Sequence, residues 1–183
     1  VLVHVLGEGK SALPSLTSEL FGQAAAFGAT GALAPALKRI TRPAQGEAFA
    51  PWQFHAADHL LEQLDGQPPG KGVKDELAPL FDSASGLVKE KHIAAETRVA
   101  ALGLLRWAPA DEQPDADALL ALMNSSHPRE VQSAALQLAA SPANDNAKVF
   151  QRVLRNWQQH TPALRGELLD MSLSRTDSTK TLL

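Results

Sequence analysis

Two histidines four residues apart, His55 and His59, form the arrangement in this chain that is closest to a metal site. In a helix, residues i and i+4 lie on one face, so both imidazoles could bind one ion. Zinc peptidases of the HExxH type have glutamate after the first histidine, but Ala56 stands there. The inverted HxxEH type has glutamate before the second histidine, and here that residue is the shorter Asp58. We interpret the two histidines as half-exposed residues of an ordinary helix, with a metal-dependent enzyme as an alternative.

Other catalytic and cofactor-binding patterns are missing from the sequence. It contains no cysteine, which excludes disulfides, thiolate metal ligands, cysteine nucleophiles and a CxxCH haem attachment within this chain. It has no GxSxG nucleophile motif. The stretch GEGKS (7–11) lacks the GxxxxGK[ST] spacing of a phosphate-binding loop, so we interpret it as a turn. We therefore predict no catalytic or cofactor-binding residue and no bound cofactor in this chain.

Charge and hydropathy argue against two classes of partner. The formal net charge is −3 and no dense Lys/Arg block occurs, whereas binding to a nucleic-acid backbone requires clustered cations. The apolar stretch VLVHVL (1–6) is too short to cross a membrane or to form the core of a signal peptide. We therefore expect protein partners or neighbouring domains, without nucleic acid and without membrane insertion by this chain.

The spacing of apolar residues, prolines and glycines predicts an all-α protein. Apolar residues recur every three or four positions, alanine and leucine dominate, and alternating Val/Ile runs are nearly absent beyond residue 6. Predicted helices in the first half cover 14–28, 31–40, 52–64 and 74–91. The last of these contains Pro79 and Gly86, which allow a kink or a break. The acidic loop with Glu112, Asp115 and Asp117 is interpreted as the start of a helix, which the helix dipole favours.

The second half of the chain contains an internal repeat. Residues 98–102 (RVAAL) align with 132–136 (QSAAL), 34 residues later, and with 165–169 (RGELL) after a further 33. The intervening helices keep the offset of 34 at three pairs: Leu120 and Leu154, Met123 and Trp157, His127 and Thr161. Each unit is then a helical hairpin that cannot bury its apolar face alone, so neighbouring units must stack.

The repeat assigns roles to individual positions. We expect the alanine pairs 100–101 and 134–135 where the first helices of adjacent units touch. We expect Arg98 and Arg165, at equivalent positions, to make ion pairs or carbonyl contacts between units. Leucines are expected to fill the space between layers, at Leu102, Leu105, Leu136 and Leu138.

Three further groups of residues are assigned structural roles. His127 falls at a helix boundary and is not expected to be a ligand. The stretch SPANDN (141–146) is predicted to precede a helix, with Asn144 or Asp145 as N-cap. The tryptophans are interpreted as packing residues, although Trp52 also allows a binding face.

The repeated segments resemble a known family. The R-x-A-A-L-x-L-L helix, P-x-E-V-Q-x-A-A-L, the tryptophan before T-P-A-L-R and the final S-R…L-L are similar to the HEAT-like segment of planctomycete-type membrane-bound dehydrogenases. These proteins, often labelled sorbosone-dehydrogenase-like, carry a C-terminal c-type haem domain. The resemblance covers 94–183 well and the remainder loosely, including ELFGQAAAFGATGALAPAL (19–37).

The resemblance implies a particular setting for the chain. In that family a propeller-type dehydrogenase domain comes first, helical repeats follow, and the haem domain comes last, in an exported, periplasmic protein. This chain contains neither neighbour, so no catalytic residue can be transferred to it, and the haem is expected in a neighbouring domain. Because the sequence begins with Val1, we expect a piece of a larger multidomain protein.

Together these observations predict one helical-repeat domain over 1–183. We expect irregular helix pairs over 1–93 and regular repeats of about 34 residues over 94–183. The predicted fold is a right-handed HEAT/armadillo-like α-α superhelix of about five helix pairs. The expected function is a non-catalytic scaffold of a larger dehydrogenase–cytochrome c protein. The alternatives are a free-standing HEAT-like adaptor and the metal-dependent enzyme that uses His55 and His59.

Overall fold

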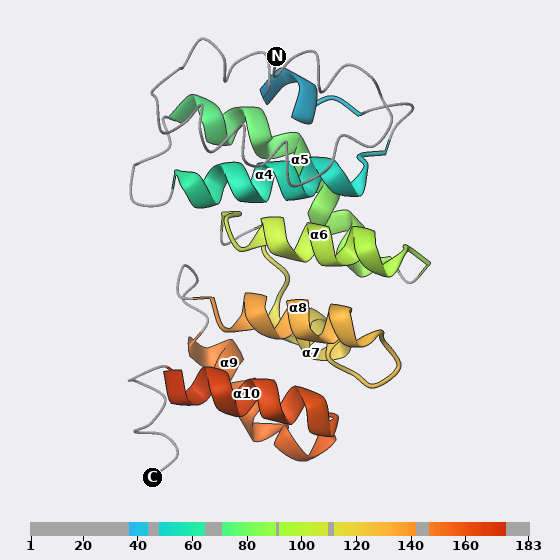
Figure 1. Cartoon of the computed structure of the whole chain (residues 1–183), viewed down its shortest axis with the longest axis vertical. Coiled ribbons are helices and arrows are strands. Elements are labelled where there is room, and N and C mark those ends of the chain that lie inside the picture. The colour runs from blue at the N-terminus through green and yellow to red at the C-terminus, as the bar shows by residue number, and fades with distance from the viewer. Residues whose placement is uncertain are drawn as a thin grey trace. The chain divides into compact units, whose positions relative to one another are not determined.

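The computed structural model describes residues 37–43, 48–64, 71–90, 92–109, 112–141 and 147–174 (Figure 1). Every extended element in these ranges is a helix and none is a strand, which confirms the all-α class. The chain divides into two compact units, Val1–Glu112 and Gln113–Leu183, and each is described by itself.

In the first unit, three helices pack on one another. They are α4 (Pro51–Gln63), α5 (Lys71–Lys89) and α6 (Ala95–Leu105), and α6 contacts both of the others. Proline at the first position of α4 suits the fixed φ of that residue. Gln53 then folds back to accept a hydrogen bond from the Ala50 amide at 3.0 Å, which satisfies a donor at the helix start.

The helices predicted at 52–64 and 74–91 are therefore confirmed as α4 and α5. The second runs unbroken through Pro79 and Gly86, which had allowed a kink or a break. Both residues lie on the exposed side of α5. The proline ring thus does not disturb the buried face, and the carbonyl that loses its donor lies on the solvent side of the helix. Of the helix predicted at 31–40, residues 37–40 are described and helical, whereas the helix at 14–28 and GEGKS lie outside the described residues.

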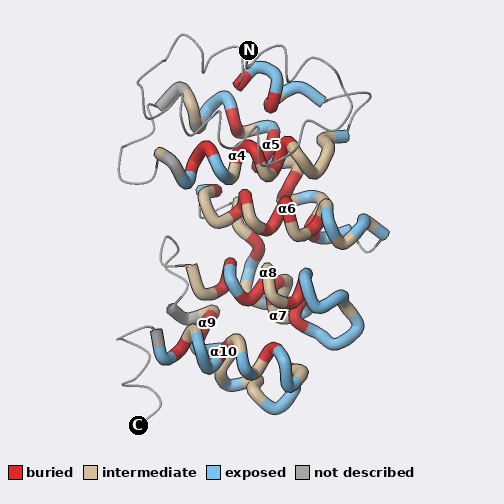
Figure 2. Tube along the Cα trace, viewed as in Figure 1, coloured by how far each residue is buried: buried red, intermediate tan, exposed pale blue. Residues whose placement is uncertain are grey.

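The core of the first unit follows the helical period of the sequence. On α5 the buried positions are 77, 80, 81, 84 and 88, and apart from the adjacent pair 80–81 they follow one another after three or four residues. Each fully buried leucine or phenylalanine contributes roughly 1.5–3 kcal/mol. Figure 2 marks the buried segments of these helices. The largest fully buried side chains on them are Phe54, Leu60, Leu77, Leu80, Phe81, Leu102, Leu104 and Leu105.

The described residues of the second unit form four α-helices and one 3-10 turn. They are α7 (Ala116–Leu122), α8 (Arg129–Ala139), α9 (Ala147–Arg155), η1 (Trp157–Gln159) and α10 (Pro162–Ser174). Helix α7 contacts α8 and α9, and α8 contacts α10. Within this unit α8 and α10 thus stack on each other, as do α7 and α9 (Figure 1).

Local sequence signals set the ends of these helices. Asp115 is the N-cap of α7 and accepts a hydrogen bond from the Ala118 amide at 2.8 Å, which confirms that the acidic loop starts a helix. His127 lies in the turn between α7 and α8, as predicted for a boundary residue. The N-cap candidates Asn144 and Asp145 lie outside the described residues, although α9 begins at Ala147 directly after them.

The predicted interlayer leucines are buried. Leu102, Leu105, Leu136 and Leu138 are at most 2% exposed. Ala100, Ala101 and Ala135 are buried as well, while Ala134 is half-buried. None of the helices in the described ranges combines the length and the apolar character that crossing a bilayer requires.

Candidate functional site

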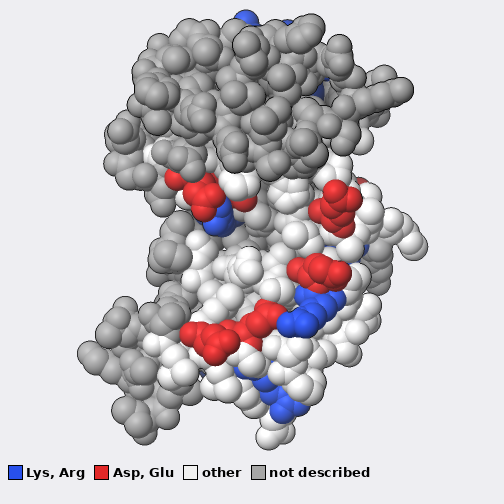
Figure 3. All heavy atoms as spheres, viewed as in Figure 1, with Lys and Arg blue, Asp and Glu red and all other residues white. Residues whose placement is uncertain are grey.

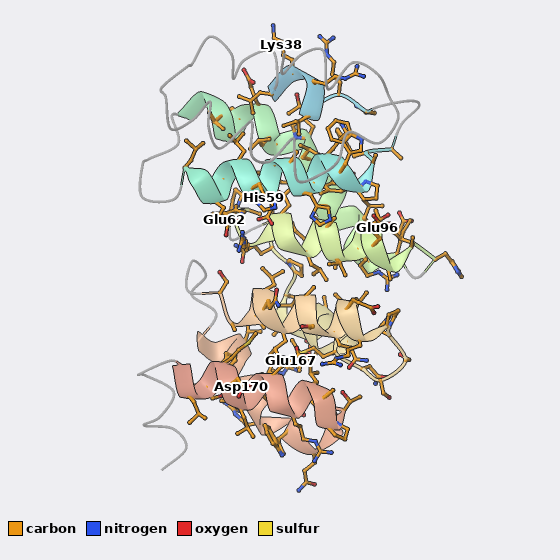
Figure 4. All side chains as sticks on the ribbon, in the orientation of Figure 1. Lys38, His59, Glu62, Glu96, Glu167 and Asp170 are labelled. Atoms are coloured by element: carbon orange, nitrogen blue, oxygen red, sulfur yellow. The ribbon has the colours of Figure 1, made fainter. Side chains whose placement is uncertain are left out.

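The two histidines that could bind a metal both lie on α4. His55 is half-buried, and His59 is exposed on the side of α4 that faces α6 (Figure 4). The Nδ1 atom of His59 is 3.4 Å from Oε2 of Glu62, one turn further along the helix. Among the described residues, no group of three His, Cys, Asp or Glu side chains is placed to hold a metal ion. The helix therefore places the two histidines one turn apart, but the described residues bring no third metal ligand to them.

Asp58, between these histidines, is the centre of a polar cluster that links α4 to α6. Its Oδ1 atom accepts a hydrogen bond from Nε1 of Trp107 at 2.7 Å. The same oxygen accepts one from Nε of Arg106 at 2.9 Å. The Arg106 guanidinium also lies over the Trp107 ring, 4.8 Å from its centroid, and its Nη2 is 3.5 Å from Oε1 of Glu62. Four side chains are thus joined at the end of α6.

The environment of Asp58 explains why these partners are needed. Its side chain is only 17% exposed, and its helix neighbours Ala57 and Leu61 are buried. A carboxylate in such a place is costly unless it is paired or hydrogen-bonded. A Cβ atom built on Gly103 would lie 3.3 Å from Oδ2 of Asp58, so the absence of a side chain there makes room for the carboxylate.

This geometry suits a structural junction better than a reactive group. One oxygen of Asp58 already accepts two hydrogen bonds from fixed donors, and Arg106 supplies the compensating positive charge. Sequence reasoning considered Asp58 only as part of a metal motif and Trp107 only as a packing residue. The available signal was a carboxylate on the buried side of an apolar helix, which predicts a partner from a neighbouring element.

In the second unit, Glu167 makes the corresponding link between α10 and α8. Its Oε2 accepts a hydrogen bond from Oγ of Ser133 at 2.6 Å, and its Oε1 is 3.3 Å from Nη2 of Arg129. Figure 4 shows Glu167 on the side of α10 that faces α8. Arg129 is exposed, so its ion pair is worth no more than about 1 kcal/mol. The shorter bond from Ser133 is the specific contact between these helices.

A third feature recurs at the start of four helices. Arg98, Gln132 and Arg165, each the fourth residue of its helix, donate a hydrogen bond to a carbonyl in the preceding connection. The acceptors are the carbonyl oxygens of Glu90, His127 and His160, at 2.6, 2.7 and 3.1 Å. Arg98 and Arg165 were predicted to make such contacts between units, and these hydrogen bonds instead join each helix to the connection before it.

Helix α4 contains a close counterpart of this contact. Gln53, its third residue, donates from Nε2 to the carbonyls of Ile40 and Arg42, at 2.6 and 2.7 Å. The amide is completely buried and its Oε1 caps the helix at the same time. In each of the four cases a long polar side chain near a helix start satisfies a backbone carbonyl of the chain before that helix.

The remaining candidates have ordinary surroundings. Asp117 forms an ion pair with Arg152, and both side chains are largely exposed. Trp52 and Trp157 are half-buried, the latter within η1. On the face in Figure 3, acidic and basic side chains of the described residues lie side by side at several points.

Comparisons of the chain with protein-family models, with curated proteins and with solved structures give no match.

Proposed function

We propose that this chain is a non-catalytic helical-repeat scaffold that binds protein partners or neighbouring domains of its own polypeptide. The observation that most directly supports this proposal concerns the buried polar side chains of the described residues. There are five of them, and each makes a hydrogen bond to a backbone carbonyl: Gln53, Arg98, Gln132, His160 and Ser172. Gln53, Arg98 and Gln132 hold the connection before their helix, while His160 and Ser172 bind carbonyls of α9 and α10. Polar groups satisfied by the backbone in this way are structural, whereas an active site directs polar groups toward a substrate.

Two further observations support a repeat architecture behind this scaffold. The equivalent positions Arg98, Gln132 and Arg165 have the same kind of contact with the loop before their helix. In the second unit, α8 stacks on α10 and α7 on α9, as expected for successive hairpins. We therefore propose a HEAT-like stacking of helix pairs, which gives proteins extended surfaces for binding other proteins.

The resemblance to planctomycete-type dehydrogenases supplies a concrete setting for the proposal. In that setting the helices hold a propeller-type dehydrogenase domain and a c-type cytochrome domain in a fixed relation, in the periplasm. The chain cannot attach the haem covalently, because it has no cysteine for a CxxCH motif. A free-standing adaptor with the same helices is the competing version of the scaffold.

The coding sequence on both sides of this chain tests the setting directly. The proposal expects a strand-rich propeller domain upstream and a CxxCH motif downstream. Their joint absence would reject the dehydrogenase setting and favour the adaptor. With the flanking domains present, cross-linking of the whole protein should join them to these helices, and a lack of any such cross-link would reject the scaffold itself.

A further inference from the structure

The last helix of the second unit has an exposed apolar face. Leu169 and Leu173 of α10 are 44% and 67% exposed, and no other large hydrophobic side chain of the described residues is classed as exposed. Pro162 and Gly166 share this face, at spacings of four, three and four residues along the helix, and are exposed as well. The outer side of α10 thus carries a continuous strip of residues without charge.

The opposite side of α10 is the one that packs on α8. Leu164 and Leu168 are buried there, and Glu167 binds Ser133 and Arg129 of α8. The exposed strip therefore takes no part in the interface between α8 and α10. It faces away from the helix on which α10 is stacked.

The repeat offset shows what kind of surface this strip is. Arg129 and Ser133 of α8 bind Glu167 of α10, and the helical spacing puts Leu136 on the same face of α8. Residues 33 positions later on α10 are Pro162, Gly166 and Leu169, which are three members of the exposed strip. Leu136 is completely buried, but its counterpart Leu169 is 44% exposed. The leucine of this helix face is therefore buried on α8 and exposed on α10.

We propose that the strip Pro162–Gly166–Leu169–Leu173 binds an α-helix of a further helical hairpin, in the register that α10 uses on α8. The inference rests on the proposed scaffold function and specifies the chemistry of one partner. Continuity with the α8–α10 interface identifies the occupant, because the equivalent face of α8 is already filled by such a helix.

The strip also defines the side chains that the partner helix must have. On α8, Arg129 and Ser133 bind a glutamate, but Pro162 and Gly166 offer no side-chain donor in their place. The partner therefore carries an apolar or small residue where α10 carries Glu167. A Cβ atom built on Gly166 meets nothing within 4 Å, which leaves room for a close approach of the partner.

A hairpin added to the complete chain provides the test. Residues 142–174 are repeated once after Ser174, and the second copy carries Glu167→Leu. Amide hydrogen exchange of the first α10 should slow by about tenfold or more, since burial of one leucine contributes at least the free energy of a tenfold change. Leu169→Asp in the first copy should remove this protection, while the same substitution in the second copy, whose strip is terminal, should not.

Two controls keep the result interpretable. Leu169→Asp in the unextended chain should leave the unfolding midpoint nearly unchanged, because the side chain is already exposed. An added hairpin that leaves exchange in α10 unchanged, or protection that survives Leu169→Asp in the first copy, would overturn the inference. So would a dimeric unextended chain that Leu169→Asp makes monomeric, since a second copy would then cover the strip. Each of these outcomes leaves cross-linking to flanking domains as a separate test of the scaffold.

Discussion

The indole nitrogen of Trp107 lies 2.7 Å from Oδ1 of Asp58, 49 positions earlier in the sequence. This hydrogen bond ties the residue two positions beyond α6 to the middle of α4, while Arg106 binds the same oxygen. Trp107 and Asp58, which the sequence alone does not connect, thus belong to one junction between the two helices. Its strength decides how firmly α6 is held on α4.

Asp58→Ala should lower the free energy of unfolding by about 1.5–3 kcal/mol, the range for hydrogen bonds to charged groups. The substitution removes the carboxylate oxygen that accepts two hydrogen bonds, so the Trp107 N–H loses this acceptor. Urea unfolding measures the change. Asp82→Ala on the exposed side of α5 is the matched control and should stay within about 0.5 kcal/mol of the native chain. Equal effects of the two substitutions would contradict a structural role for Asp58.

Gly103→Ala and Gly86→Ala should differ although both glycines lie inside helices. Replacing a helical glycine by alanine ordinarily stabilises by roughly 0.5–1 kcal/mol. Gly86 has open space around it and should show this gain, whereas a Cβ on Gly103 comes 3.3 Å from Oδ2 of Asp58. Thermal unfolding of the two variants should therefore show a higher midpoint for Gly86→Ala only. A similar rise for Gly103→Ala would mean that the Asp58 carboxylate moves aside at no cost.

Zinc analysis of the purified protein tests the metal alternative. We expect well below one equivalent per chain, and the same content in a His55→Ala variant, because catalytic zinc sites use about three protein ligands. In the described residues His55 and His59 have no third ligand in place. One equivalent of zinc in the native chain that is lost in His55→Ala would instead support the enzyme and oppose a purely structural role.

The sequence predicted those features that depend on periodicity and on local signals. Helix class, the approximate bounds of α4 and the helix start at the acidic loop follow from apolar spacing and from residues within one turn of each other. The burial of Leu102 and Leu136 follows in the same way, since one face of each helix must leave water.

The candidate site was predicted much less well, because its contacts join residues far apart in the sequence. Asp58 and Trp107 come from positions that show no common pattern, so their pairing depends on how α4 and α6 pack. The role of Gly103 is likewise set by the carboxylate beside it and not by its own helix. The common position of Arg98 and Arg165 was visible in the repeat, but the carbonyl that each one binds depends on the path of the preceding loop.

Gln132 and Gln137 of α8 offer the sharpest test of the contacts between helix starts and loops. Gln132 is 5% exposed and donates to the His127 carbonyl at 2.7 Å, while its Oε1 is 3.4 Å from Oγ1 of Thr161. Gln132→Ala leaves that carbonyl without this donor and should cost about 1–3 kcal/mol in urea unfolding. Gln137→Ala changes the same residue type on the exposed side of the same helix, and should be neutral or slightly stabilising through helix propensity. If both substitutions were neutral, solvent would replace the side chain at the loop carbonyl, and the recurring contact would not stabilise the helix pairs.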